Sequence, residues 1–302
     1  MILIWGDRDD GPVTSVLAKL DPDKTLLVDQ SAYARLQGEL RLDDGHADGW
    51  LRVDCRTIAV EELTGFYLRP YSTAASFDSH RLLDVTVAVD GILLNLAEVL
   101  PPTTAVVNKP SAMATNDSKP TQAALIASFG FPVPETIVTT DADVAVAFWE
   151  QHGDVIYKST SGVRSIAKRF TDAHRARLSN IANCPTQFQA FVPGDDHRVH
   201  VVGDEVFATR IVSEATDYRY ASLTGDERAM TTVTLPNDVA TRCITMARAL
   251  DLLLAGIDLR CTPDGTWYCF EVNTSPAFSW FESHTGQPIA TAIASLLGRG
   301  HG

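Results

Sequence analysis

Short apolar runs alternate with amphipathic segments over the first hundred residues. The runs end at glycine, proline or charged residues, as buried strands do, and they are Ile2–Trp5, Thr25–Val28, Thr57–Val60 and Phe66–Leu68. Val13–Leu20 predicts a helix between the first two. Apolar residues at three- and four-residue steps predict a long helix over Arg81–Leu100, which ends at a pair of prolines. Strands that alternate with helices indicate an α/β domain with a largely parallel sheet.

The middle of the chain is predicted to form a compact α+β unit. Apolar runs predict strands over Thr104–Val107, Thr136–Thr139 and Asp154–Lys158. The helix predicted over Ser118–Phe129 stops at a glycine, and Asp141 caps a helix that runs to about His152. The segment Ser165–Arg169 and a helix over Thr171–Ala182 complete the unit.

Antiparallel hairpins dominate the last third of the chain. Strands are predicted over Gln187–Val192, Arg198–Val202 and Glu205–Val212, with Gly203–Asp204 as a hairpin turn. A helix over Asn237–Leu252 precedes a second hairpin, Leu254–Arg260 with Thr266–Val272, and Gln287–Leu297 forms a closing helix. Repeats and low-complexity linkers are absent, so we expect the units to pack together.

Composition excludes some classes of protein and leaves others open. The 302 residues are 45% hydrophobic and carry a net charge of −13, which disfavours a nucleic-acid surface because phosphates require a basic face. The five cysteines lack CxxC spacing, so buried free thiols in a reducing compartment are favoured over a Cys261–Cys269 disulfide. The N-terminus predicts a strand rather than a signal peptide, and the apolar stretches fall short of the ~18 residues of a membrane span. We expect a cytoplasmic protein.

Two carboxylates and an amide are predicted to share one face of the last hairpin. Glu271 and Asn273 lie two residues apart on a strand, so their side chains point the same way, and Asp258 lies on the neighbouring strand. Such an oxygen set suits Mg²⁺ when phosphate oxygens complete its octahedron. The alternative is the polar outer face of an exposed hairpin. Both strands are otherwise apolar, and acids within apolar strands are costly unless a counter-charge lies beside them.

Candidate phosphate-binding cations lie upstream of this hairpin. Lys158 precedes the loop Ser159–Gly162, whose backbone N–H groups could close over a phosphate, and Lys119 begins a helix. Taken alone, a surface lysine before a turn is the commoner explanation for Lys158, and Lys119 is individually no stronger as a candidate. Arg198 and Arg210 lie on paired strands and could face the same pocket.

Several catalytic and metal-binding motifs are missing from the sequence. It has no GxxxxGK[ST], no GxGxxG after the first strand, no HExxH and no GxSxG. His197 and His200 are three apart on a predicted strand, so they should point to opposite faces and form no metal pair.

In order, several segments resemble the ATP-grasp superfamily, and within it the RimK-type ligases. They are NKPSAMATNDSKPTQAALIASFGFPVPETIVTT, VIYKSTSG, TQFQAFVPGDDHRVHVVGDEVFATRI, AGIDLR and FEVNTSP, and they span about two thirds of the chain from Asn108. The resemblance implies an ATP-grasp fold of mixed α/β and α+β class. Its expected parts are an N-terminal pre-ATP-grasp α/β domain (1–107), a central lid domain (108–185) and a C-terminal antiparallel-sheet domain with the Mg/ATP site (186–302).

The resemblance also implies a role for each matched residue. Lys119 and Lys158, with Ser159 and Gly162, would hold the phosphates of ATP, and Asp196 would lie near the ribose. The main chain of the hinge, residues Gln189, Ala190, Phe191 and Val192, would recognise adenine. The family typically has Glu where this chain has Ala190, so main-chain contacts should matter more here. Arg198 and Arg210 would lie near the phosphates and the acyl phosphate, and Asp258, Glu271 and Asn273 would bind Mg²⁺.

A narrower resemblance to microviridin-type (graspetide) peptide ligases rests on two short segments, Phe66–Tyr71 and Ala277–Glu282. Leu68 stands where that pattern has an arginine. The candidate substrate contacts are Arg69, Arg260 and Glu282. We expect the acceptor-binding surface around Arg69 and Tyr71 and in loops such as Ser213–Thr224, for which a mobile solvated loop is at least as good an explanation.

The resemblance implies a ligase that joins a carboxylate substrate to an amine acceptor (an amino acid, peptide or protein) through an acyl phosphate, with ATP and Mg²⁺ as cofactors. Other hypotheses are a macrocyclase acting on a precursor peptide, a phosphotransferase that releases the phosphorylated acid, and a nucleotide-binding regulatory protein. Neither a nucleic acid nor a membrane is expected as a partner, and homo-oligomerisation is left open.

Overall fold

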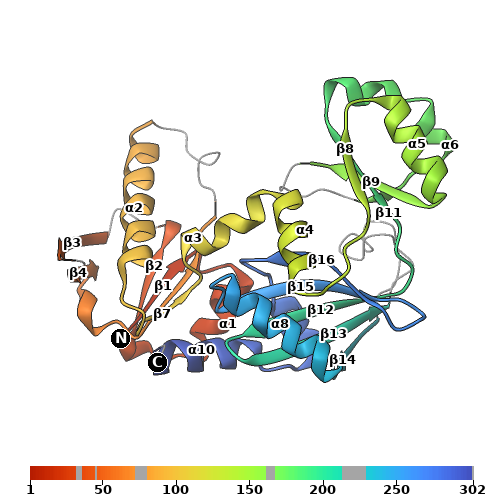
Figure 1. Cartoon of the computed structure of the whole chain (residues 1–302). Helices are drawn as coiled ribbons and strands as arrows, with labels where there is room; N and C mark the ends of the chain where they lie inside the picture. Colours follow the sequence, from red (N-terminus) through yellow and green to blue (C-terminus); the bar gives the residue numbers. More distant parts are fainter. Residues whose placement is uncertain (32–35, 45, 72–79, 161–166, 213–228, 301–302) are drawn as a thin grey trace.

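The N-terminal part contains a parallel sheet in the strand order β2-β1-β6-β7. The computed structural model describes residues 1–31, 36–44, 46–71, 80–160, 167–212 and 229–300. The sheet consists of β1 (Ile2–Gly6), β2 (Thr25–Asp29), β6 (Gly65–Arg69) and β7 (Ala105–Val107). All five residues of β1 are buried, because both faces of the sheet are covered. Helices α1 (Gly11–Leu17) and α10 (Ile289–Arg299) pack on one face, and α2 (His80–Val99) packs on the other (Figure 1). The parallel sheet and the long second helix are therefore confirmed.

A second, antiparallel sheet in this part was not predicted. It comprises β3 (Leu36–Asp43), β4 (His46–Val53) and β5 (Arg56–Ala59), in that order. The predicted strand Thr57–Val60 belongs to this sheet and not to the parallel one, which corrects our interpretation. Leu51 and Ile58 join the core under α2, while most of β3 is exposed. Strands with so few buried positions carry little of the alternation on which prediction depends.

A separate small sheet, in the order β10-β9-β11-β8, forms the projecting unit at the upper right of Figure 1. Its strands are β8 (Thr136–Thr139), β9 (Val155–Ser159), β10 (Lys168–Arg169) and β11 (Thr186–Ala190), and α5 (Ala142–His152) packs on it. Asp141 caps α5 as predicted, since its carboxylate accepts hydrogen bonds from two N–H groups of the first turn. We call this unit the lid sheet.

Two predictions for this unit are wrong. The single helix expected over Thr171–Ala182 is instead a short α-helix, α6 (Asp172–Arg175), and a separate 3₁₀ segment, Leu178–Asn183. The strand expected over Gln187–Val192 is β11, which pairs with β8 and β9 of the lid sheet rather than with the later strands.

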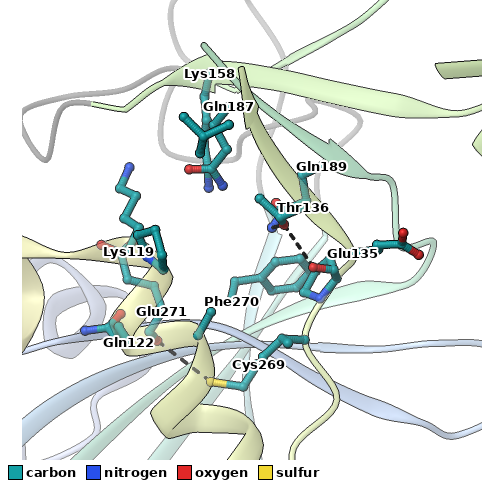
Figure 2. Close-up of a pocket in the computed structure, with 15 residues that line it drawn as sticks. Lys119, Gln122, Glu135, Thr136, Lys158, Gln187, Gln189, Cys269, Phe270 and Glu271 are labelled. Atoms are coloured by element: carbon teal, nitrogen blue, oxygen red, sulfur yellow. Dashed lines mark hydrogen bonds between the residues drawn. The ribbon is translucent and has the colours of Figure 1, made fainter. Parts of the chain in front are cut away.

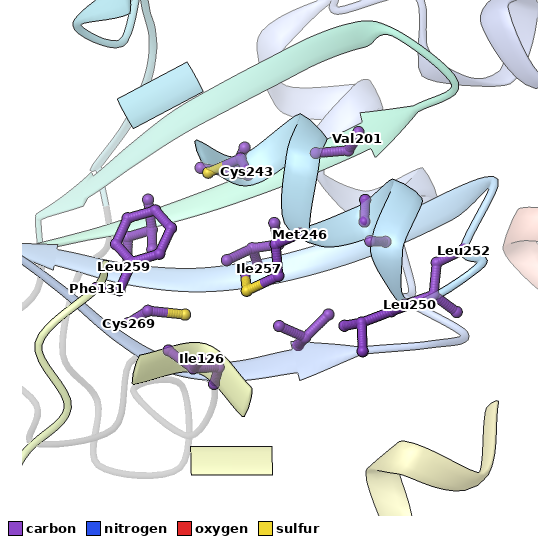
Figure 3. Packing of buried hydrophobic residues seen from close by; sticks show 14 of the residues in the cluster. Ile126, Phe131, Val201, Cys243, Met246, Leu250, Leu252, Ile257, Leu259 and Cys269 are labelled. Carbon is purple, nitrogen blue, oxygen red and sulfur yellow. The ribbon is translucent and has the colours of Figure 1, made fainter. Parts of the chain in front are cut away.

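The largest sheet is antiparallel, in the order β14-β13-β12-β15-β16. Its strands are β12 (Asp195–Val202), β13 (Glu205–Val212), β14 (Ala229–Val233), β15 (Leu254–Cys261) and β16 (Trp267–Asn273). Helix α8 (Asn237–Ala249) and the C-terminal end of α4 (Lys119–Ser128) pack on one face, where Ile126, Met246, Ile257 and Leu259 meet in the main core (Figure 3). Helices α10 and α9 (Ser279–Thr285, not predicted) lie on the other side.

The five cysteines are free, and Cys243 and Cys269 are buried as expected. Cys55 and Cys184 are exposed, so the expectation of buried thiols is wrong for them. None of the helices in the described ranges has the length and apolar character needed to cross a bilayer.

Candidate active site

A cavity of about 650 Å³ lies between the lid sheet, α4 and β16. Figure 2 shows Lys119 extending from α4 toward the lid sheet, and Lys158 and Gln187 extending from the lid strands into the same cavity. Glu271 and Phe270 of β16 lie at the lower side of the cavity in this view. Four residues proposed from the sequence therefore line one cavity: Lys119, Lys158, Gln189 and Glu271. Two cations and a carboxylate around a space of this size suit a small anionic ligand.

The strand register brings the predicted metal ligands together. Asp258 of β15 lies opposite Glu271 of β16, and the amide Nδ2 of Asn273 donates to Oδ2 of Asp258 over 3.3 Å. A β-bulge follows Asp258, so Cys269 and Val272 both face the main core although they are three residues apart. Glu271 and Asn273 consequently point to the opposite face, as predicted.

Asp258 lies beside the counter-charge that an acid in an apolar strand requires. The Arg198 guanidinium donates to Asp258 Oδ1 over 2.7 Å, and the two side chains are 8% and 18% exposed. The alternative of a solvated hairpin face is therefore wrong at this position, because the pair is largely removed from water.

This donor set fits a hard divalent cation. The Nδ2 group of Asn273 donates to Gly256 O and to Asp258, which leaves its carbonyl oxygen as the part of the amide suited to bind a metal. Two carboxylates and one amide oxygen are ligands that Mg²⁺ accepts, with phosphate oxygens and water completing its coordination. Among the described residues, no cluster of three or more His, Cys, Asp or Glu side chains is found.

His200 contacts the Arg198 guanidinium in the protein interior. Its side chain is fully buried, and its Nε2 accepts a hydrogen bond from Arg198 Nε over 3.4 Å. Burial, and then the charge of Arg198, lower the pKa of His200 well below its usual value, so the imidazole is neutral. His197 lies on the other face against Trp267, which confirms that the two histidines diverge.

Arg210 does not join Arg198, and the prediction that they face one pocket is wrong. Arg198 pairs in register with Thr209, so its neighbour Arg210 points to the opposite side of the sheet. There Arg210 is 45% exposed and donates to Asp195 over 2.6 Å.

Asp196 and Arg260 form an ion pair on adjacent strands. Arg260 donates to Asp196 Oδ1 over 2.7–2.8 Å and to the carbonyl of Val192 over 2.8 Å, and its side chain is 12% exposed. A guanidinium that is committed in this way is not presented to a substrate, so Arg260 is a poor substrate contact in this structure. Its contacts tie the hinge to the largest sheet.

The hinge itself is packed between cations. The Phe191 ring lies 3.2 Å from the guanidinium carbon of Arg169 in the lid sheet and 5.5 Å from that of Arg260. The N–H groups of Ala190 and Phe191 already donate to the carbonyls of Glu135 and Asp154. These two donors are therefore not available for main-chain recognition of adenine.

Gln189, on β11 of the lid sheet, lines the cavity. Its side chain is buried, and Nε2 donates to Thr136 Oγ1 over 3.0 Å. Ser159 ends β9 and is exposed, whereas Gly162 and the loop 213–224 lie outside the described residues.

The two remaining predicted substrate contacts have protein partners. Arg69 donates to Asp10 over 2.6 Å and to the carbonyls of Ser275 and Pro276 just beyond β16. Glu282 accepts from the N–H of Ala290 in the first turn of α10. Both side chains are therefore engaged in hydrogen bonds within the protein.

Residues that the sequence did not single out also shape the site. Phe270, Gln187, Thr136 and Gln122 line the cavity. Asn108 donates to the carbonyl of Leu254 at the start of β15 and to that of Thr274 just after β16. Gln122 lies one helical turn after Lys119, which was the available signal for it.

Comparison with known proteins identifies the family to which the chain belongs. A family model described as a RimK-like ATP-grasp domain matches residues 116–297, which contain every cavity-lining residue. The chain belongs to the RimK-like ATP-grasp family. A search of curated proteins found no match.

Solved structures of ATP-grasp ligases resemble the whole chain. The ligase PsnB, complexed with a phosphomimetic variant of minimal precursor, Mg and ADP, is 26% identical, with a TM-score of 0.78 over 98% of this chain and 97% of that one. A RiPP-associated ATP-grasp ligase from Chryseobacterium gregarium, in complex with ADP and a leader and core peptide, shares the fold at 22% identity and a TM-score of 0.80, with 99% and 98% covered. The macrocyclase MdnC from Microcystis aeruginosa MRC, bound with precursor peptide MdnA, does so at 17% identity and 0.80, with 99% and 100% covered.

This RimK-like ATP-grasp protein is therefore an ATP-dependent ligase with ATP and Mg²⁺ as cofactors. Its similarity to graspetide-type ligases, first indicated by two short segments, extends over nearly the full chain.

Proposed function

We propose that this ligase activates a carboxylate of a peptide substrate with ATP and joins it to an amine through an acyl phosphate. The observation that carries the proposal is the single cavity in which Lys119 and Lys158 face Glu271, with Asp258 and Asn273 beside it on the same sheet face. Cations opposite a hard-metal donor set are what phosphoryl transfer requires.

Each group of residues has a distinct task in this proposal. Lys119 and Lys158 would bind the phosphates, while Asp258, Glu271 and Asn273 would hold Mg²⁺. The bound metal would offset negative charge on the transferring phosphoryl group. Arg198 orients Asp258 through their ion pair, and the lid sheet would exclude water that would otherwise hydrolyse the acyl phosphate. A covalent enzyme nucleophile is not needed.

A peptide substrate is supported by the solved structures that the chain resembles. PsnB was solved with minimal precursor and with precursor peptide PsnA2, at 25–27% identity to this chain and with 98% of it covered. Because that match includes the N-terminal domain, which contributes nothing to the cavity lining, we favour a peptide over a free amino acid as the source of the carboxylate.

A second candidate function is macrocyclisation, in which the carboxylate and its acceptor belong to the same precursor peptide. The whole-chain resemblance to the macrocyclases MdnC and MdnB favours it. Acceptor hydroxyls would then give esters and acceptor amines would give amides.

The test is ADP release with carboxylate and amine pairs and with short acidic peptides that contain Thr, Ser or Lys. Formation of ADP and phosphate that depends on the acceptor is expected, and mass spectrometry should show the loss of one water per bond. Glu271→Gln should abolish turnover, whereas Glu205→Gln, an exposed carboxylate at the far hairpin turn, should not. AMP as the product, or undiminished turnover in Glu271→Gln, would refute the proposal.

A further inference from the structure

Gln122 of α4 binds the backbone of β16 as an additional strand would. Its Nε2 donates to the carbonyl of Val272 over 2.9 Å, and the N–H of Val272 donates to its Oε1 over 3.0 Å. The side chain is 3% exposed, so both hydrogen bonds are shielded from water. Since β16 is the last strand of its sheet order, this part of its outer edge is satisfied by a side chain instead of a strand.

The position of this contact along β16 gives it a consequence for the site. Val272 lies between Glu271 and Asn273, two of the proposed metal ligands. The N–H of Val272 belongs to the peptide plane shared with Glu271, and its carbonyl belongs to the plane shared with Asn273. One glutamine amide therefore fixes both peptide planes from which the two ligands project.

The same side chain links the metal ligands to a proposed phosphate ligand. Gln122 and Lys119 are three residues apart on α4 and both line the cavity. A shift of α4 would therefore move Lys119 and the backbone of β16 together. The spacing between Lys119 and Glu271 is therefore held by the helical backbone from Lys119 to Gln122 and by the two hydrogen bonds of Gln122 to Val272.

We propose that Gln122 is a positioning residue that sets the geometry of the metal ligands Glu271 and Asn273. This inference rests on the proposed metal site. Partners that orient metal ligands typically change metal affinity by about 10- to 100-fold when they are removed. Removing the amide of Gln122 should have an effect of this size although Gln122 is not itself a ligand.

A purely structural role predicts a different outcome, and the chain supplies a matched control. Gln287 is also buried, donates to the carbonyl of Ala208 over 3.2 Å and accepts from Thr209 Oγ1 over 2.9 Å. It binds β13 of the same sheet and does not line the cavity. Gln122→Met and Gln287→Met remove the same chemical group from two buried positions, which are 3% and 7% exposed.

The experiment measures Mn²⁺ binding in the presence of ADP by electron paramagnetic resonance, together with hydrogen exchange of the Val272 amide. We expect Gln122→Met to weaken Mn²⁺ binding by at least about tenfold and to speed exchange at Val272. Gln287→Met should leave both unchanged within about threefold, a difference of less than 1 kcal/mol. If Gln122→Met does not fold, Gln122→Asn, which retains the amide but is one methylene shorter, takes its place.

Equal weakening in the two variants, or Mn²⁺ affinity in Gln122→Met within about threefold of wild type, would overturn the inference. Glu271→Gln separates this failure from a failure of the proposed site. Loss of Mn²⁺ binding in Glu271→Gln with normal binding in Gln122→Met removes only the positioning role. Normal binding in Glu271→Gln removes the metal site itself.

Discussion

Loss of the Asn108 side chain should strongly destabilise the protein. Its side chain is 2% exposed and joins the end of β7 to two later segments. Nδ2 donates to the carbonyls of Leu254 and Thr274 over 2.6 Å each, and Oδ1 accepts from the N–H of Leu254 over 3.0 Å. Asn108→Ala removes all three hydrogen bonds without opening a large cavity.

The magnitude follows from these contacts. Each buried backbone group left without a partner costs about 1–3 kcal/mol, less where water can enter. Three such groups at a site shielded from solvent give an expected loss of about 3–5 kcal/mol, which is a large share of a typical folding free energy. Because Thr274 directly follows Asn273, nucleotide binding should also weaken.

The assay is urea denaturation followed by circular dichroism, with Asn95→Ala as the control. Asn95 is exposed on α2, where alanine should change the unfolding free energy by less than about 1 kcal/mol. A loss below about 1 kcal/mol in Asn108→Ala would mean that the three contacts contribute little, and the reasoning from buried hydrogen bonds would be refuted.

Three further predictions concern charge and packing around the site. Asp258→Ala leaves the buried Arg198 without its carboxylate and should cost about 3–5 kcal/mol in urea denaturation, and adding Arg198→Met should recover part of this loss. His200 has a lowered pKa in the folded chain, so the unfolded chain takes up its proton first and stability falls as pH drops below 6.5, by up to about 1.4 kcal/mol per pH unit. Denaturation at a series of pH values should show a shallower slope in His200→Gln. Phe191→Leu removes the ring that lies between Arg169 and Arg260. The free energy that holds the hinge segment Gln189–Val192 in place should fall by about 1–2 kcal/mol, and hydrogen exchange around β11 should become faster.

The sequence predicted the elements that have a continuous apolar signal. Buried strands such as β1 and the long helix α2 follow directly from runs and periodicity. The hairpin of β3 and β4 could not be predicted in the same way, because most side chains of β3 are exposed. For β11 the strand itself was predicted correctly but its partners were not, since pairing across the chain leaves no local signal.

At the site, strand geometry correctly predicted the arrangement of the three polar side chains on one hairpin. Glu271 and Asn273 share a face, and Asp258 lies opposite, because a two-residue spacing and a hairpin register are local properties. The prediction for Arg210 was wrong because the side of the sheet to which this side chain points depends on the register between β12 and β13. In that register Thr209, rather than Arg210, lies opposite Arg198. The contacts of Gln122 with Val272 span 150 residues and needed the folded chain.

The segment that follows β16 is held by side chains at the carboxyl ends of β6 and β7. Arg69 of β6 binds the carbonyls of Ser275 and Pro276, and Asn108 after β7 binds that of Thr274. Arg69 is itself oriented by Asp10, whose carboxylate also accepts from the hydroxyl of Tyr71. The position of Asn273 thus depends on the docking of the parallel sheet.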